Sequence, residues 1–121
     1  MKQLICHLKT LTCHHCDERD GDELFIKFNG KRIWPEKEKY IKGADNCVIP
    51  INIFLPVEGS AKIILQLWDY DLICNDLLGE FNFLADENGQ FVCDLNNRGT
   101  GVHKFSLEFA VNVVRKQSAN R

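Results

Sequence analysis

Long apolar runs are missing from this sequence of 121 residues, and so are internal repeats, low-complexity tracts and Pro/Gly-rich linkers. No apolar segment is long enough to span a bilayer. Lys2 lies near the start, as a lysine does in many signal peptides, but no cleavage pattern follows it. We therefore expect a cytoplasmic protein. Because no linker divides the chain, residues 1–114 are predicted to form one domain, followed by a polar C-terminal tail over residues 115–121.

A strong excess of one charge is missing as well. The net charge of −2 offers no general attraction for nucleic acid, so we expect no nucleic-acid partner. The sequence contains no G-x-S-x-G, P-loop or H-E-x-x-H motif, and we therefore expect no enzymatic activity. A Cys–His nucleophile stays open, because a sequence does not reveal which cysteines and histidines lie together.

The six cysteines are predicted to be reduced thiols, because nothing in the sequence indicates export and a chain with 45% hydrophobic residues needs no disulfides to fold. Two of them belong to the motif Cys13-His14-His15-Cys16. Two thiolates at this spacing often bind zinc, but a tetrahedral site needs two further ligands, for which Cys74 and either histidine are candidates. A structural zinc site, a redox dithiol and uncommitted thiols are the three alternatives.

Short segments rich in β-branched and aromatic residues recur along the chain, separated by residues that favour turns. Their regular spacing predicts an all-β fold, an antiparallel β-sandwich of about eight strands. A turn of helix within Trp34–Ile41 is the best exception. The predicted strands are Gln3–Leu11, Glu23–Asn29, Arg32 to about Ile41, Asn46–Leu55, Lys62–Trp68, Leu78–Leu84, Gln90–Asp94 and His103–Val114.

Alternation of apolar and polar residues in two of these strands identifies candidate core residues. Side chains two positions apart share one face of a strand, so an apolar set with this spacing is predicted to face the core. The candidates are Ile63, Leu65 and Leu67 in one strand and Phe105, Leu107, Phe109, Val111 and Val113 in the other.

Carboxylates are concentrated in two loops, Asp17–Glu23 before one predicted strand and Asp69–Asp76 after another. Calcium takes six to eight oxygen ligands, so a site needs several carboxylates from more than one chain segment. The spacing of an EF-hand is absent, and strands rather than helices flank the first loop. Two acidic loops at one end of a sandwich could instead share calcium.

One part of the chain closely resembles the C2 domain family. Leu65-Gln66-Leu67-Trp68-Asp69-Tyr70-Asp71, followed by Asn75-Asp76-Leu77-Leu78-Gly79-Glu80-Phe81, is similar to the family's strand ending in Asp-x-Asp, a loop, and then Asn-Asp, two apolar residues and Gly. Upstream, Asp17 through Lys27 resembles the first acidic loop and its Asp-Pro-Tyr strand, with Glu23 and Leu24 in place of Pro and Tyr. The loop Asp69–Asp76 corresponds to the family's third loop and is one residue shorter than in typical members. The segments agree in order and spacing from Leu4 to about Val111, which implies a C2-like β-sandwich.

The resemblance also implies calcium-dependent binding to an anionic phospholipid surface. Calcium would neutralise the clustered carboxylates and accept an oxygen from the lipid. The middle loop Gly43–Asn46 would lie at the same end of the sandwich. The implied calcium ligands are Asp17, Asp22, Asp69, Asp71 and Asp76, with Asp20 competing with Asp17 for the first position.

Two further surfaces are candidates for contact with lipid. Leu72, Ile73 and Cys74 lie between the implied ligands, and we predict that this apolar tip enters the membrane; the alternative is that it folds back against neighbouring loops. The resemblance adds a lysine-rich face that binds anionic lipid in relatives. In this sequence Glu36 and Glu38 interrupt the corresponding run of cations, which favours an ordinary solvated edge instead. Its cations are Lys27, Lys31, Arg32, Lys37, Lys39 and Lys42.

The predicted function is therefore a calcium-dependent module that binds phospholipid membranes and is peripheral to the membrane when calcium is bound. The alternative is a C2-like domain for protein–protein interaction or self-assembly, without functional calcium binding. A zinc-stabilised variant that uses Cys13 and Cys16 is the third hypothesis.

Overall fold

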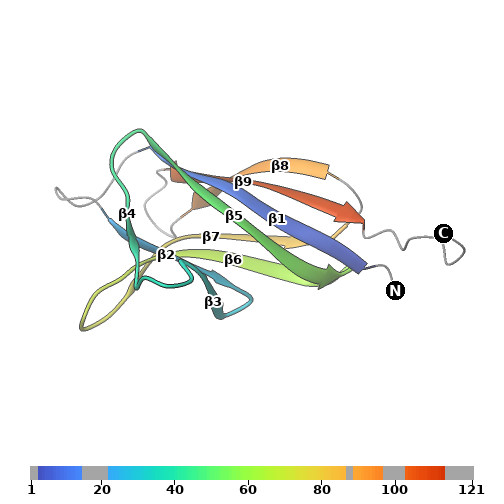
Figure 1. The fold of residues 1–121 in the computed structure, drawn as a ribbon, viewed down its shortest axis with the longest axis horizontal. Coiled ribbons are helices and arrows are strands. Elements are labelled where there is room, and N and C mark those ends of the chain that lie inside the picture. The colour runs from blue at the N-terminus through green and yellow to red at the C-terminus, as the bar shows by residue number, and fades with distance from the viewer. Residues whose placement is uncertain (1–2, 15–21, 87–88, 97–102, 114–121) are drawn as a thin grey trace, which may run out of the picture.

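The computed structural model describes residues 3–14, 22–86, 89–96 and 103–113, which form nine β-strands (Figure 1). Within these ranges, no helix is long and apolar enough to cross a membrane. The described residues form strands and no helix, which confirms the predicted all-β class. The strands are β1 (Gln3–Cys13), β2 (Glu23–Phe28), β3 (Lys31–Trp34), β4 (Ile41–Lys42), β5 (Cys47–Glu58), β6 (Lys62–Asp69), β7 (Asp76–Leu84), β8 (Gly89–Asn96) and β9 (His103–Val113).

The strands form two facing layers along one hydrogen-bonded path. Its order is β3-β2-β6-β7-β8-β9-β1-β5, all neighbours are antiparallel, and β4 pairs with β2. In the described part of the chain, β7 and β8 share a single residue pair, Glu80 with Asn96. The path turns a corner at this point, and the strands on its two sides pack as the layers of a sandwich (Figure 1). The predicted antiparallel sandwich is confirmed.

Gly79 lies where this corner brings β7 close to β8. A Cβ atom added to Gly79 would lie 2.6 Å from the backbone oxygen of Leu95 and 2.7 Å from its Cβ. A side chain cannot approach a backbone so closely, so the absence of a side chain at Gly79 allows the two layers to join here.

The core lies between the two layers and is filled by the inward residues of the alternating strands. The three candidate residues of β6 are buried, as are four of the five candidates of β9. The fifth, Val113, is half-buried and packs against the same core. Alternation in the sequence therefore identified the inward faces of β6 and β9 correctly.

The predicted strand from Arg32 to about Ile41 is divided into β3 and β4, which raises the strand number from eight to nine. Pro35 directly follows β3 and lacks the N–H group that a strand ladder needs. Residues 35–39 form bends, and the helical turn predicted within Trp34–Ile41 does not form. We call residues 35–40 the 35–40 loop. The Arg32 guanidinium holds this loop against the sheet by donating hydrogen bonds to the backbone oxygens of Glu38 and Lys39.

β5 forms an irregular edge of the sandwich, next to β1. The pairing of the two strands shifts register between Leu8 and Thr10, opposite Asn52, which adopts a left-handed φ of 53°. Pro50 and Pro56 lie on either side of this bulge. The pairing of β5 with β1 is therefore regular on both sides of the bulge and interrupted at the bulge itself.

Candidate functional site

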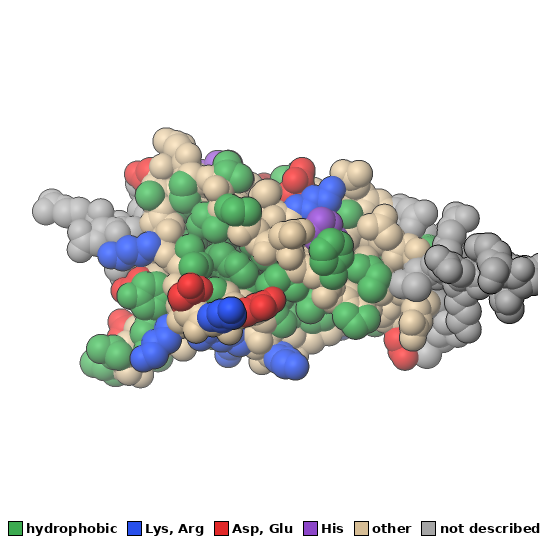
Figure 2. All heavy atoms as spheres, in the orientation of Figure 1, with side chains coloured by type: hydrophobic (Ala, Val, Ile, Leu, Met, Phe, Trp, Pro, Cys, Tyr) green, Lys and Arg blue, Asp and Glu red, His purple; other side chains and the backbone are tan. Residues whose placement is uncertain are grey.

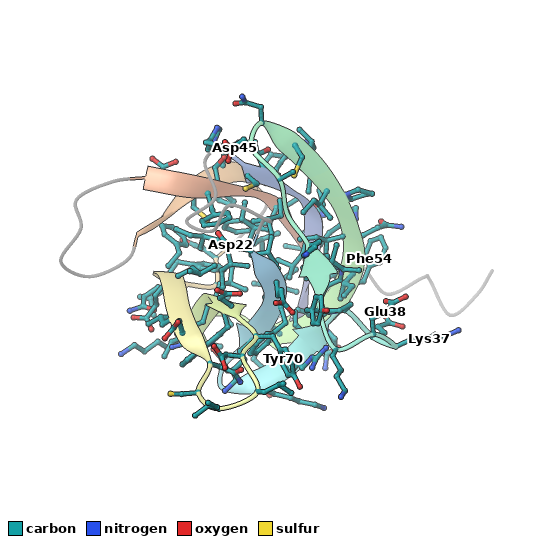
Figure 3. All side chains as sticks on the ribbon, turned by 90° about the vertical axis from the view of Figure 1, so that its left-hand side faces the viewer. Asp22, Lys37, Glu38, Asp45, Phe54 and Tyr70 are labelled. Carbon is teal, nitrogen blue, oxygen red and sulfur yellow. The ribbon has the colours of Figure 1, made fainter. Side chains whose placement is uncertain are left out.

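Three segments meet at one end of the sandwich, where backbone hydrogen bonds join them. The Gly43 N–H donates to the Asp22 oxygen over 2.8 Å, and the Tyr70 N–H donates to the Glu23 oxygen over 2.7 Å. We call this end, made of residues 22–23, 43–46 and 69–76, the acidic pole. It faces the viewer in Figure 3, with Asp22 near its centre and Asp45 and Tyr70 on opposite sides. The described parts of the two acidic loops thus lie at one end, as a shared site requires.

Asp22 and Asp69, two of the predicted ligands, are anchored in the fold. Asp22 is fully buried, and Asp69 is 6% exposed. One carboxylate oxygen of Asp69 accepts a 2.9 Å hydrogen bond from the Glu23 N–H, which ties the end of β6 to the start of β2. Among the described residues, no buried side-chain nitrogen or oxygen lacks a hydrogen-bond partner, so the burial of these carboxylates is compensated.

The loop between β6 and β7, residues 70–75, is shaped by its own polar side chains. Asp71 Oδ1 accepts a 2.9 Å hydrogen bond from the Ile73 N–H, and Asn75 Oδ1 accepts one of 2.9 Å from the Asp71 N–H. Such local turns are typical of Asp and Asn, whose short side chains reach the nearby backbone. Asp71 is exposed, and Asp76 pairs with Asp69 where β7 begins. The predicted ligands of this loop therefore flank its tip.

Leu72 and Ile73 project from the acidic pole into solvent. Their side chains are 87% and 96% exposed, and Cys74 beside them is also exposed. Figure 2 shows an apolar projection at the lower left, where Figure 1 places the loop between β6 and β7. The tip therefore does not fold back against the neighbouring loops, which was the alternative to membrane contact.

The predicted calcium ligands have the right chemistry, because carboxylate oxygens are the donors that calcium prefers. However, within the described ranges no three His, Cys, Asp or Glu side chains converge to hold a metal ion. Like charges repel one another, and Asp69 and Asp71 already accept backbone N–H groups. Asp17 and Asp20 lie outside the described residues.

A cavity of about 450 Å³ opens at the acidic pole, next to the tip. The rings of Tyr40 and Tyr70 stack in its wall, with centroids 5.5 Å apart and 25° between their planes. A hydrogen bond to the Glu23 carboxylate, together with the charge of that group, raises the pKa of the Tyr40 hydroxyl. The cavity is lined by Glu23, Lys39, Tyr40, Tyr70, Asp71 and Leu72.

Sequence reasoning missed the tyrosines and Glu23 as site residues. Tyr70 stands between two predicted ligands, which was an available signal. Tyr40 gave none, because it is far from Tyr70 in the chain and reaches it only through the pairing of β4 with β2 and of β2 with β6.

The cationic run predicted from the sequence is partly engaged in packing on the sheet face. The Lys27 Nζ lies 4.7 Å from the centroid of the Trp68 ring. The guanidinium carbon of Arg32 lies 5.2 Å from the centroid of the Phe25 ring, while its N–H groups hold the 35–40 loop. Both cations therefore have a structural role on this face.

The described cysteines form neither a metal site nor a disulfide. No disulfide links any two of Cys6, Cys13, Cys47, Cys74 and Cys93. Cys13 is buried, whereas its candidate zinc partner Cys74 is exposed at the tip. Cys16 lies outside the described residues. The described part of the Cys13–Cys16 motif thus offers no support for zinc.

Thiol reactivity is expected to differ sharply between Cys74 and the core cysteines. Burial raises the pKa of Cys6 to about 11 and that of Cys93 to about 12. Because the thiolate is the reactive form, both should resist alkylation at neutral pH in the folded protein, while Cys74 reacts. Peptide mapping by mass spectrometry after brief iodoacetamide treatment measures this order. Modification of Cys6 or Cys93 before Cys74 would contradict it.

Comparison with solved structures identifies the fold. "Structure of a C2 domain" matches with a TM-score of 0.66 and 12% identity, over 95% of this chain and 100% of that chain. A C2 domain of plant extended synaptotagmin 1 matches with a TM-score of 0.63 and 13% identity, over 97% of each chain. The calcium-bound pair of C2 domains from extended synaptotagmin 2 matches with a TM-score of 0.64 and 13% identity, over 93% of this chain and 45% of that chain. No protein-family model matches the sequence, and a search of curated proteins finds no match.

The chain therefore has the fold of a C2 domain. At 12–13% identity the likeness lies in the path of the backbone. One fold serves many functions, so the function has to be argued from the side chains of the acidic pole.

Proposed function

We propose that this protein binds phospholipid membranes in a calcium-dependent manner through its acidic pole. One observation carries the proposal: carboxylates from two loops and an exposed apolar tip lie at the same end of the sandwich. Without a cation, the carboxylates would repel the phosphates of a bilayer and keep the tip away from it. A bound divalent cation would remove that repulsion.

The proposed ligands among the described residues differ in burial: Asp22 and Asp69 lie inside the fold, and Asp71 and Asp76 are exposed. Asp22 and Asp69 are buried, and the hydrogen bond from the Glu23 N–H keeps their two loops adjacent. Asp71 joins the site to the tip, because its carboxylate also accepts the Ile73 N–H. When bound, calcium supplies positive charge and a coordination position for a phosphate oxygen. The proposed set is completed by Asp76 and by Asp17 and Asp20, which lie outside the described residues.

The partner in this proposal is an anionic phospholipid surface, to which a cytoplasmic protein would attach peripherally when calcium rises. Leu72 and Ile73 would enter the membrane, with Cys74 beside them. A similar structure, that of extended synaptotagmin 2, is calcium bound, which is consistent with the proposal.

Calcium is expected to stabilise the folded protein. At a calcium concentration 100 times the dissociation constant, the free energy of unfolding should rise by about 2.7 kcal/mol. Asp71→Asn should weaken this response, because it removes the charge and keeps an oxygen that can accept the Ile73 N–H. Glu58→Gln is the matched control, since Glu58 is exposed and pairs with Gln3 at the far end of β1.

Calorimetric titration with calcium, repeated with zinc and each time with anionic liposomes, distinguishes the three hypotheses. The proposal is supported if calcium gives a heat of binding and the protein then associates with the liposomes. Heat from zinc alone would point to a zinc-stabilised domain. If calcium leaves both the melting temperature and liposome binding unchanged, the proposal is overturned in favour of an interaction module.

A further inference from the structure

The cavity at the acidic pole is lined by aromatic and cationic side chains as well as by carboxylates, whereas a calcium bridge to phosphate requires carboxylates alone. Its volume of about 450 Å³ falls within the range of small-molecule sites. The lining comes from three separate segments: the start of β2, the 35–40 loop and residues 70–72. Side chains of different chemistry from these three segments face one cavity and can contact one ligand together.

One part of the lining combines aromatic rings with a carboxylate. Tyr40 and Tyr70 are stacked, and the Glu23 carboxylate accepts a hydrogen bond from the Tyr40 hydroxyl. Aromatic rings attract cations, and quaternary ammonium groups are the cations that aromatic sites in proteins characteristically recognise. The carboxylate of Glu23 adds a full negative charge at the same place. This part of the cavity suits an organic cation.

Lys39 gives the same cavity a positive charge. An ammonium group can receive a phosphate as a point charge. The lining therefore carries both signs and matches a ligand in which a phosphate and a quaternary ammonium stand a short distance apart.

The walls of the cavity are held in position by hydrogen bonds. Arg32 donates to the backbone oxygens of Glu38 and Lys39, directly before Tyr40. On the other side, the Tyr70 N–H donates to the backbone oxygen of Glu23. Walls that are already ordered lose little conformational entropy when a ligand binds.

We propose that this cavity binds the phosphocholine headgroup of a membrane lipid, with the quaternary ammonium against Tyr40, Tyr70 and Glu23 and the phosphate toward Lys39. The inference rests on the proposed function and names a headgroup that the acidic pole selects within the membrane. Its position fits this role, because Leu72 both lines the cavity and is 87% exposed at the tip. A tip that enters the bilayer would leave the cavity at the level of the headgroups.

Free phosphocholine tests the site without any membrane. In an NMR titration at saturating calcium, phosphocholine should shift the signals of the 35–40 loop and of residues 70–72 and bind more tightly than phosphoethanolamine. Tyr40→Ala should lower the affinity for phosphocholine by roughly five- to thirtyfold, the range expected for the loss of one cation–π contact. Tyr40→Phe should recover most of the affinity. Phe54→Ala is the matched control, since Phe54 is an exposed aromatic residue on β5.

Equal binding of phosphocholine and phosphoethanolamine, or equal binding by wild type and Tyr40→Ala, would overturn the inference. Inorganic phosphate serves as the third ligand. If it displaces phosphocholine completely and produces the same shifts, the cavity recognises phosphate alone and the choline assignment is wrong.

Binding to vesicles distinguishes failure of the phosphocholine site from failure of calcium-dependent membrane binding as a whole. Sedimentation would use vesicles with a constant fraction of phosphatidic acid, the remainder being phosphatidylcholine or phosphatidylethanolamine. Several-fold stronger calcium-dependent binding to the phosphatidylcholine vesicles, lost in Tyr40→Ala, supports the headgroup site. Equal calcium-dependent binding to both vesicles overturns the site and leaves the proposed function intact. If neither vesicle binds, the proposed function fails, and the titration with free phosphocholine still decides the site.

Discussion

Replacing Leu72 and Ile73 together by serine is expected to weaken calcium-dependent membrane binding by about two to four orders of magnitude. The two side chains are almost fully exposed on the loop that carries Asp71, so each would move from water into the bilayer on binding. Burial of one such side chain contributes ~1.5–3 kcal/mol, and two contribute ~3–6 kcal/mol. Calcium affinity in the absence of lipid should hardly change, because neither residue offers a carboxylate.

Liposome sedimentation at low and high salt measures this effect. Insertion adds a term that salt does not screen, whereas a purely electrostatic bridge weakens as salt rises. The matched control is the double variant Leu84→Ser and Val92→Ser, which removes two apolar side chains that are 67% and 70% exposed away from the tip. Equal binding by wild type and the Leu72/Ile73 variant would contradict insertion and leave calcium bridging as the better account.

Gly79→Ala is expected to destabilise the fold by about 3 kcal/mol or more. The new methyl group would meet the Leu95 backbone oxygen at 2.6 Å, so β7 or β8 has to shift at the corner that joins the two layers. Overpacking of this kind typically costs ~1–3 kcal/mol, and a contact with backbone lies at the upper end because no side chain can move aside.

Urea unfolding followed by tryptophan fluorescence measures the loss. Gly30→Asn is the control, since Gly30 has a left-handed φ of 83° with no atom within 4 Å of an added Cβ, and Asn tolerates this conformation. We expect it to change the stability by less than about 1 kcal/mol. A similar small effect of Gly79→Ala would show that the corner can relax without cost.

The sequence predicted the parts of the fold that follow from local periodicity. The inward faces of β6 and β9 could be identified because apolar residues alternate with polar ones, and the two strands bury Leu67 and Phe109 as that alternation requires. The acidic loops were found for a related reason, since each is a continuous run of residues beside a strand. Such features depend on neighbours in the chain.

Features that depend on distant residues were not predicted. The division of β3 from β4 is explained by Pro35, but the anchoring of the 35–40 loop depends on where the Arg32 side chain reaches in three dimensions. The contact of Tyr40 with Tyr70 requires three strands to pair in one particular order. Asp22 is buried, and its backbone oxygen accepts a hydrogen bond from Gly43 of the middle loop; the composition of either loop reveals neither feature.

The irregular edge at β5 bears on how closely copies of the protein can crowd together. A bare strand edge is a template for another strand, and prolines on an edge remove the outward N–H groups that an incoming chain would need. Pro50 and Pro56 do this on both sides of the bulge at Asn52, which also bends the strand. At the other end of the path, β3 is only four residues long and begins with Lys31 and Arg32. Copies of the protein concentrated on a two-dimensional surface would therefore resist edge-to-edge aggregation.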